Sequence, residues 1–289
     1  MSAPELPTDL GAVVARALAE DLGEGDLTAD LVPAPYRAVA TVVSREDAVL
    51  CGTAWFEEVF VQLEPAVSIE WRFEDGDRVG PGMELCRLEG PARPLLSGER
   101  TALNFLQSLS GTATLAHAYA EAVAGTGCSV LDTRKTLPGL RSAQKYAVAC
   151  GGATNHRHGL YDALLIKENH IIAAGGIAAA LQAARAIHPG FLVEIEVESG
   201  DELELALDGG ADIVLLDNFS LDGLRAAVAR VRSRPDCRTR MEASGNVSLD
   251  NVRSVAETGV DFVSVGAITK NLRAIDLSMR FRLQGPDSA

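Results

Sequence analysis

Positive charge in this acidic chain is concentrated in one segment, residues 132–170. The segment carries six Lys and Arg against three Asp and Glu, and it holds three of the four lysines and three of the five histidines. Its net charge is therefore +3, whereas the other residues carry 20 Lys and Arg against 37 Asp and Glu, and the whole chain is at −14. Cations gathered in one place within an acidic protein predict a site for a strongly anionic small molecule.

The cationic residue types in this segment suit the recognition of carboxylates and phosphates. Arg can bind such a group through two parallel hydrogen bonds, and Lys acts as a point charge. Several donors together indicate a ligand, or a pair of ligands, with more than one negative group. For any single member, a surface ion pair is the competing explanation. The candidate set is Arg134, Lys135, His156, Arg157 and Lys167, while Arg141 and Lys145 are expected on a helix surface or behind the site.

Two carboxylates lie downstream, and each ends or nearly ends an apolar run. Glu196 belongs to VEIEV, and Asp217 closes IVLLD. Paired carboxylates beside a phosphate site predict Mg²⁺, held through these oxygens together with substrate oxygens. The two acids could instead contact ribose hydroxyls directly, or be satisfied by backbone N–H groups or by Lys167.

Two turns of small residues complete the candidate site. They are ASGNVS at residues 243–248 and VGAIT at residues 265–269. Small residues let backbone N–H groups approach a phosphate, and β/α barrels commonly bind phosphate after their last two strands. Tight turns without a ligand are the alternative for either one alone. Their occurrence in consecutive units favours phosphate binding.

The elements that must position these residues alternate between strand-like and helix-like runs. Polar strand ends follow one another at steps of 21 to 29 residues, as in β-α units with short loops. The sequence therefore predicts an α/β fold with a parallel β/α barrel, whose carboxyl strand ends meet at one face. A doubly wound open sheet is the alternative, and it would gather only the ends near its switch point. The strand-like runs are residues 129–134, 163–167, 193–197, 213–217, 240–245 and 262–266.

The N-terminal part has a different texture, with a helix expected over Leu10–Leu22 and mainly antiparallel strands after it. The expected strands are residues 38–45, 48–52, 67–73 and 84–90, and a helical run over Leu96–Leu109 follows them. We predict an N-terminal α+β domain over residues 1–115, joined by residues 275–289, and a catalytic barrel over residues 116–274.

Composition excludes several classes of function. With a pI near 4.8, the chain offers no broad basic face for nucleic acid or for acidic membrane surfaces. No apolar run reaches about 18 residues, so no transmembrane helix is expected. The first residues lack the basic start of a signal peptide. The five cysteines are odd in number and include no C-x-x-C pair, which favours a reduced, cytoplasmic chain.

Motifs spread over residues 10–280 resemble the quinolinate phosphoribosyltransferase family. They are EDLGEGDLTADL, SGERTALNFLQSLSGTAT, DTRKTLPGLRSAQKYAV, GG-x-x-NHR-x-GL-x-D-x-x-LIKENH, EIEVES, LLDNF, EASGN and FVSVGAIT, in that order. The resemblance implies an N-terminal α/β sandwich domain followed by an incomplete, TIM-like β/α barrel. It also implies a pentosyltransferase of NAD biosynthesis that converts quinolinate and 5-phosphoribosyl-1-pyrophosphate, with Mg²⁺, into nicotinate mononucleotide, pyrophosphate and CO₂.

The resemblance also implies roles for individual residues and a homodimer, or a higher oligomer, with shared active sites. The catalytic residues would be Lys135, Lys167, Glu196 and Asp217, the last two serving the ribose and its metal. Quinolinate would be bound by Thr133, Arg134, Lys135, His156, Arg157, Lys167 and, from the partner subunit, Arg100. The 5-phosphate would be held by Ser244, Gly245, Asn246, Val265, Gly266 and Ala267, with Lys270 near enough to assist. Asn246 stands where many relatives have a second glycine, and Asn is the least costly replacement if a positive φ is required.

Other functions fit parts of this pattern. A related phosphoribosyltransferase could act on another aromatic acid, such as nicotinate. A metal-dependent hydrolase would use His156, His158, Lys167, His170 and Asp217, although the histidines span only 15 residues. Lys167 could form a Schiff base in an aldolase. A phosphosugar-binding protein without turnover is the non-enzymatic alternative.

Overall fold

The computed structural model describes residues 4–284, which form two compact units. The first unit contains the chain up to His117, Thr136–Gly152 and the chain from Asn271 onward. The second contains Ala118–Lys135 and Ala153–Lys270, so the chain passes between the units four times. The domain boundaries predicted at residues 115 and 275 stay a prediction, and residues 285–289 lie outside the described part of the chain.

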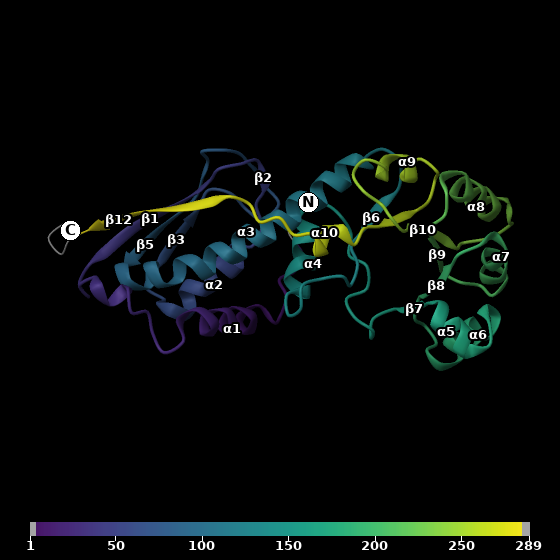
Figure 1. Cartoon of the computed structure of the whole chain (residues 1–289), viewed down its shortest axis with the longest axis horizontal. Coiled ribbons are helices and arrows are strands. Elements are labelled where there is room, and N and C mark those ends of the chain that lie inside the picture. Colours follow the sequence, from purple (N-terminus) through teal and green to yellow (C-terminus); the bar gives the residue numbers. More distant parts are fainter. Residues whose placement is uncertain (1–3, 285–289) are drawn as a thin grey trace. The chain divides into compact units, whose positions relative to one another are not determined.

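An antiparallel sheet organises the first unit. Its order is β12 (Leu277–Gln284), β1 (Arg37–Ser44), β5 (Glu84–Pro91) and β3 (Ser68–Trp71). A two-stranded pair, β2 (Ala48–Val49) with β4 (Arg78–Val79), stands apart from it. Figure 1 shows the late strand β12 beside the early strand β1, and their register runs from Arg37 opposite Gln284 to Ser44 opposite Leu277.

The helices of the N-terminal region are α1 (Leu10–Leu22), the short 3₁₀ helix η1 (Ala29–Leu31), α2 (Thr53–Leu63), α3 (Ala92–Ala122) and α4 (Arg141–Cys150). Helix α1 has the predicted bounds, but the prediction that the later helix ends at Leu109 is wrong. Gly111, which suggests a helix end in the sequence, instead allows close packing, because a Cβ there would lie 2.1 Å from the carbonyl oxygen of Arg273. Helix α3 therefore continues past it.

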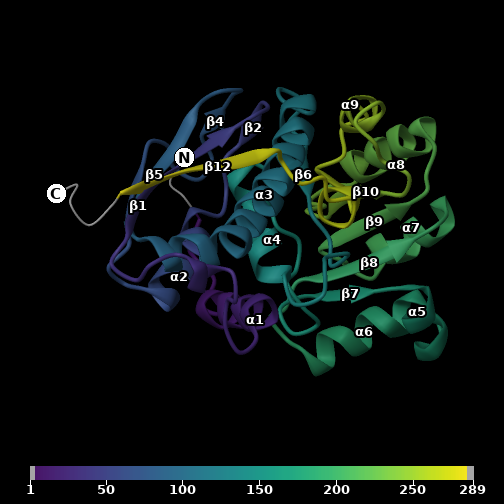
Figure 2. The ribbon, with the colours of Figure 1, turned by 60° about the vertical axis from the view of Figure 1, so that its left-hand side comes forward.

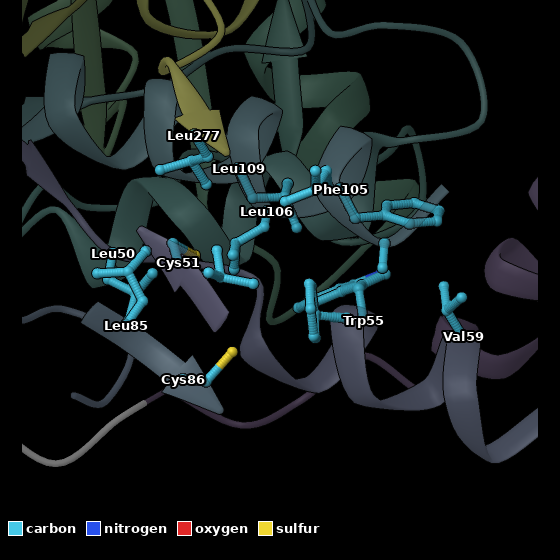
Figure 3. Close-up of a cluster of buried hydrophobic side chains, with 14 of the residues drawn as sticks. Leu50, Cys51, Trp55, Val59, Leu85, Cys86, Phe105, Leu106, Leu109 and Leu277 are labelled. Carbon is cyan, nitrogen blue, oxygen red and sulfur yellow. The ribbon is translucent and has the colours of Figure 1, made fainter. Parts of the chain in front are cut away.

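The core of the first unit lies between helices α2 and α3 and the sheet. Figure 3 shows Trp55 from α2 in one cluster with Leu106 and Leu109 from α3. Trp55, Phe56 and Leu106 are completely buried. Burying one such side chain stabilises the fold by about 1.5–3 kcal/mol relative to leaving it exposed.

A parallel sheet organises the second unit. Its order is β6 (Ser129–Leu131), β11 (Phe262–Ser264), β10 (Arg240–Ser244), β9 (Ile213–Asp217), β8 (Val193–Val197) and β7 (Leu164–Ile166). The strands from β7 to β11 are neighbours in chain order, and β6 lies at the far edge beside β11. This is the order of a β/α barrel left open between β6 and β7. It lacks the reversal that defines a doubly wound sheet.

Helices follow the strands of this sheet in turn. They are α5 (Glu168–Ala174), α6 (Ile177–Ile187), α7 (Gly200–Asp208), α8 (Leu221–Ser233), α9 (Val252–Ala256) and α10 (Ala267–Lys270). Figure 2 shows α6, α7 and α8 along the outside of the sheet. Ser199 and Ser220 cap α7 and α8, since their hydroxyls accept hydrogen bonds from the backbone N–H groups of Glu202 and Gly223. The predicted α/β class is confirmed, with an N-terminal sheet domain and a parallel β/α sheet.

Within residues 4–284, no single helix is long and apolar enough to cross a membrane. The pair α5 and α6, bent by 88° at the break between them, reaches that length and composition only when the two are taken together. Helix α6 buries Ile177, Ala180 and Leu181, as expected for a helix that packs on a sheet.

Candidate active site

A cavity of about 330 Å³ lies at the carboxyl ends of the parallel strands. This volume is within the usual range for small-molecule sites. Side chains two residues apart on a strand share a face, so Lys167 and Leu165, or Asp217 and Leu215, point into it together. Nine of the predicted site residues line the cavity: Thr133, Arg134, Lys135, His156, Arg157, Lys167, Glu196, Asp217 and Ser244.

A larger cavity, of about 700 Å³, lies at the opposite, amino ends of the strands. Its lining includes Asp212, Thr239 and Arg240, which precede or begin β9 and β10. None of the predicted site residues lines it. The smaller cavity is therefore the candidate active site.

Two guanidinium groups, of Arg134 and Arg157, line the candidate site and lie close enough to repel each other. Burial and the neighbouring charge of Arg134 lower the pKa of Arg157. Arg157 donates from Nη1 to the carbonyl oxygen of Ala163 at 3.3 Å, which fixes its position. The buried Nε of Arg134 has no hydrogen-bond partner within residues 4–284. Two like charges with an unused buried donor form a ready binding site for an anion.

His156 is held on both sides of its ring. Its Nε2 lies 3.0 Å from Oε2 of Glu194, and its Nδ1 accepts a hydrogen bond from the backbone N–H of Arg157 at 2.7 Å. The backbone N–H of His156 donates to Oδ1 of Asp132 at 2.8 Å. Because Nδ1 acts as an acceptor, the proton belongs on Nε2 and the ring is neutral. His156 thus lines the cavity without adding charge.

An ion pair and a second carboxylate form the other side of the site. Nζ of Lys167 lies 2.5 Å from Oε2 of Glu196. Burial and the neighbouring charge of Glu196 raise the pKa of Asp217, while Lys167 and Lys135 oppose the change. Two carboxylates this close favour a positive partner. Their oxygens are the ligands that Mg²⁺ prefers, so the donor set fits the predicted ion.

The turn after β11 lies against Lys135. A Cβ on Gly266 would stand 2.9 Å from Cδ of Lys135, and the hydroxyl of Thr269 donates to the carbonyl oxygen of Lys135 at 2.8 Å. The backbone N–H of Val265 is already bonded to the carbonyl oxygen of Leu131 at 2.9 Å. In this turn, the backbone N–H groups expected to approach a ligand are therefore those of Gly266 and Ala267.

The turn after β10 has two residues in the left-handed region. Gly245 has φ of +101° and Asn246 has φ of +51°. A Cβ on Gly245 would lie 2.2 Å from Oδ1 of Asn218, so both the conformation and the space require glycine there. The positive φ of Asn246 is the conformation for which asparagine is the least costly replacement of glycine. Nδ2 of Asn251 donates a hydrogen bond to the carbonyl oxygen of Asn246 at 3.0 Å.

Several other predicted residues fall outside the cavity lining. Arg100 is an exposed residue of α3 in the first unit. Nδ1 of His170 accepts the backbone N–H of Lys167 at 3.0 Å, so this histidine stabilises the start of α5. Lys145 is completely buried, which rules out a helix surface for it. Arg141 donates to the hydroxyl of Thr136 at 3.1 Å.

Sequence reasoning missed two acids at the base of the cavity, Glu194 and Glu242, of which Glu242 lines it. Both lie two residues before a predicted strand-end residue, on the same face of the strand. That spacing was the available signal, since a charged residue inside VEIEV or RMEAS must point either into the barrel or into the helices. Burial and the neighbouring Glu194 raise the pKa of Glu242 to about 8.

The residues of a hydrolase site are not gathered here. Within residues 4–284, the groups of three or more His, Cys, Asp and Glu close enough to hold a metal are Cys51, Asp75 and Cys150, and His156, Glu194 and Glu242. Neither group contains His158, His170 or Asp217. The amine of Lys167, which an aldolase would need, is paired with Glu196.

An open parallel β/α barrel with paired arginines, paired acids and small-residue turns at its carboxyl face defines a barrel enzyme for anionic small molecules. Residues 26–110 match the N-terminal domain, and residues 112–280 the C-terminal domain, of quinolinate phosphoribosyl transferase. The chain belongs to the quinolinate phosphoribosyl transferase family.

Individual relatives agree with this assignment. The chain is 41% identical to a nicotinate-nucleotide pyrophosphorylase [carboxylating] of Mycobacterium leprae, over 92% of this chain and 95% of the relative. It is 36% identical to a quinolinate phosphoribosyltransferase [decarboxylating] of Nicotiana tabacum, over 96% of this chain and 84% of the relative. A solved nicotinate-nucleotide pyrophosphorylase from Francisella tularensis superposes with a TM-score of 0.92, at 44% identity, over 96% of this chain and 98% of that one.

Proposed function

We propose that this protein transfers the phosphoribosyl group of 5-phosphoribosyl-1-pyrophosphate to quinolinate. The products are nicotinate mononucleotide, pyrophosphate and CO₂, in the de novo biosynthesis of NAD. The observation that carries the proposal is one cavity lined both by an arginine pair and by the pair of acids Glu196 and Asp217. The family and its relatives supply the identity of the substrates.

The arginine side of the cavity suits quinolinate, which has two carboxylates on adjacent ring carbons. Arg134 and Arg157 can each bind a carboxylate through two N–H groups. Burial and the charge of Arg134 lower the pKa of Arg157, and the charge of a bound dianion would offset both effects. Attraction at this range is worth several kcal/mol per pair on paper, and desolvation removes much of it. Binding therefore depends on how firmly the two arginines are positioned.

The acidic side suits the ribose of the donor. Breaking the anomeric C–O bond develops positive charge at the anomeric carbon and negative charge on the departing pyrophosphate. Glu196 and Asp217 would stabilise the first charge and Lys135 the second, and all three line the cavity. The 5-phosphate would bind at the turns after β10 and β11, near Ser244 and Gly266.

Glu196 and Asp217 would also hold Mg²⁺, with the remaining ligands coming from the donor. When bound, the ion supplies charge neutralisation for the pyrophosphate. The fit rests on the two carboxylates in one cavity and on the pKa of Asp217, which burial and the charge of Glu196 raise. Lys167 stays bonded to one oxygen of Glu196, which orients this carboxylate.

Decarboxylation needs no nucleophile from the protein. After transfer the ring nitrogen is positively charged and stabilises the electron pair that stays on the adjacent ring carbon when the carboxylate leaves as CO₂, and a proton from solvent then replaces the lost carboxylate. The protein's part is to keep the ring oriented. The cationic residues hold the carboxylate that remains in the product.

We also propose a cytoplasmic homodimer with shared active sites, in which Arg100 of one subunit completes the site of the other. The support is the exposure of Arg100 on α3 and the family resemblance. Nothing in the proposed chemistry requires nucleic acid or a membrane.

The reaction can be tested by release of labelled CO₂ from carboxyl-labelled quinolinate. Release should require both the phosphoribosyl donor and Mg²⁺, and nicotinate should not replace quinolinate. Turnover of nicotinate without turnover of quinolinate would move the assignment to a related transferase. Donor binding without CO₂ release would indicate a binding protein.

The variant Lys135→Ala tests whether Lys135 contributes to the site. Loss of a charged hydrogen-bond donor to the substrates should lower kcat/KM by roughly tenfold to a hundredfold. Arg225→Ala is the control, because Arg225 is an exposed cation of α8 that pairs with Asp222. Equal activity in both variants would remove Lys135 from the site.

A further inference from the structure

Three polar side chains lie together at the base of the candidate active site. Glu194 of β8 is 4% exposed and Glu242 of β10 is fully buried. Nε2 of His156 lies 3.0 Å from Oε2 of Glu194 and 3.6 Å from Oε2 of Glu242. Within the described residues, Oε1 of Glu194 and both carboxyl oxygens of Glu242 form no hydrogen bond of normal geometry, although Ser264 and Glu194 lie close enough to influence the pKa of Glu242. Buried polar groups with so few partners are costly, which suggests that they are kept for a purpose.

A bound cation is the first explanation to consider, because the three candidate ligand atoms lie within 4.8 Å of one another. The bonding of the imidazole argues against it. Nδ1 accepts the backbone N–H of Arg157, so the ring proton sits on Nε2. A protonated Nε2 donates to Glu194 and has no lone pair for a metal.

A proton shared between Glu194 and Glu242 explains instead how the two acids can be buried side by side, because only one of them is then charged. Burial and the nearby charge of Glu194 raise the pKa of Glu242 to about 8. Glu242 is therefore neutral near pH 7 and can offer an O–H to Glu194. Glu194 then remains a carboxylate that accepts from Nε2 of His156.

The connection continues from the ring to the arginine pair. His156 stands between Glu194 and the backbone N–H of Arg157, at 3.0 Å and 2.7 Å. Asp132, which is buried, fixes the same segment through the backbone N–H of His156 and through Nδ2 of Asn155, each at 2.8 Å. The backbone that carries the guanidinium of Arg157 is thus held in position by His156 and Asp132.

We propose that Glu194 and Glu242 are positioning residues for quinolinate: they orient neutral His156, and His156 holds the backbone of Arg157 in its binding position. The inference rests on the proposed function for its ligand. It assigns the two glutamates an effect on one substrate only, since the donor is expected on the Glu196 and Asp217 side of the cavity.

Glu194→Met tests this, because methionine keeps the volume and removes the acceptor. The KM for quinolinate should rise roughly tenfold to a hundredfold, as expected when a hydrogen bond to a charged group is lost. The KM for the phosphoribosyl donor should stay within about threefold of wild type, below the cost of one such bond. Glu242→Met should act in the same direction, and Glu242→Gln, which keeps a neutral donor, should restore quinolinate binding.

Glu257→Gln is the control, since Glu257 is an exposed partner of Arg253 on α9. An unchanged quinolinate KM in folded Glu194→Met protein, or equal increases for both substrates, would overturn the proposal. So would stoichiometric metal in the purified protein that is lost in Glu242→Met.

A second measurement does not depend on activity. The ring ¹⁵N shifts of His156, assigned with His156→Asn, should show a neutral Nε2–H tautomer in wild type and a changed tautomer ratio in Glu194→Met. A cationic or Nδ1–H ring in wild type would refute the network. If wild-type protein shows this tautomer but does not turn over quinolinate, the proposed function fails and the network stands.

Discussion

Depth along one strand decides what a glutamate can do in this protein. Glu194 and Glu196 project from the same face of β8, but their side chains are 5% and 16% exposed. The shallower Glu196 reaches Lys167, while the deeper Glu194 reaches His156. The same residue type therefore serves the substrate at one depth and the scaffold at the next.

Glu242 should make stability depend on pH in a definite direction. Its folded pKa, about 8, lies above the ordinary glutamate value of 4.5 because of burial and the nearby charge of Glu194. A raised folded pKa means that the stabilisation is complete below about pH 4.5 and is lost as pH rises toward 8. Unfolding by urea should thus show the wild type losing stability relative to Glu242→Gln between pH 5 and 8, by at most about 4 kcal/mol.

Glu257→Gln again provides the comparison, since an exposed pair contributes little. Its stability should differ from wild type by a constant amount across the same range. A pH-independent difference between wild type and Glu242→Gln would show that Glu242 is ionised in the folded protein.

At the scale of elements, the turn after β10 is the most constrained part of the site. Gly245→Ala should destabilise the fold by about 1–3 kcal/mol, from left-handed strain and from contact with Asn218. The KM for the phosphoribosyl donor should rise with it, because the 5-phosphate is expected at this turn. Urea unfolding and initial rates measure the two effects.

Gly175→Ala is the control that separates the effect of backbone strain from the effect of lying at the proposed phosphate site. Gly175 has φ of +88° at the end of α5, and a Cβ there would meet nothing within 4 Å. It should cost about 1 kcal/mol through strain alone and leave the donor KM unchanged. Equal KM effects in both variants would argue against phosphate binding at Gly245.

The sequence predicts strands β8 and β9 to the residue, because short apolar runs bounded by helix caps leave few alternatives. It extends β6 too far: the strand ends at Leu131, where Asp132 turns to bond His156 and Asn155. The types of residue in the sequence are enough to predict the cations of the site. They do not predict the tautomer of His156, because the tautomer depends on where the backbone N–H of Arg157 lies in the folded protein.

At the scale of the whole molecule, the proposed shared site predicts complementation. Arg100→Ala and Lys135→Ala proteins should each retain at most about a tenth of wild-type activity, and a mixture should regain activity. Random exchange makes half of the dimers hybrid, each with one intact site, so about a quarter of wild-type activity is expected. Rates measured after subunit exchange provide the test.

Exchange itself must be shown, by mass spectrometry of differently labelled subunits. Wild-type protein mixed with either variant controls for the dilution of sites. Demonstrated hybrids without recovered activity would place Arg100 outside the site of the partner subunit.

The pairing of β12 with β1 joins strands about 240 residues apart in the chain. During synthesis, at roughly 5–20 residues per second, β1 waits about 12–50 s for this partner. Throughout that time one edge of the first sheet has free N–H and C=O groups, the kind of edge that recruits strands from other chains. The nascent protein is thus most exposed to aggregation while its second unit is being made, and its yield should depend on chaperones that bind extended segments.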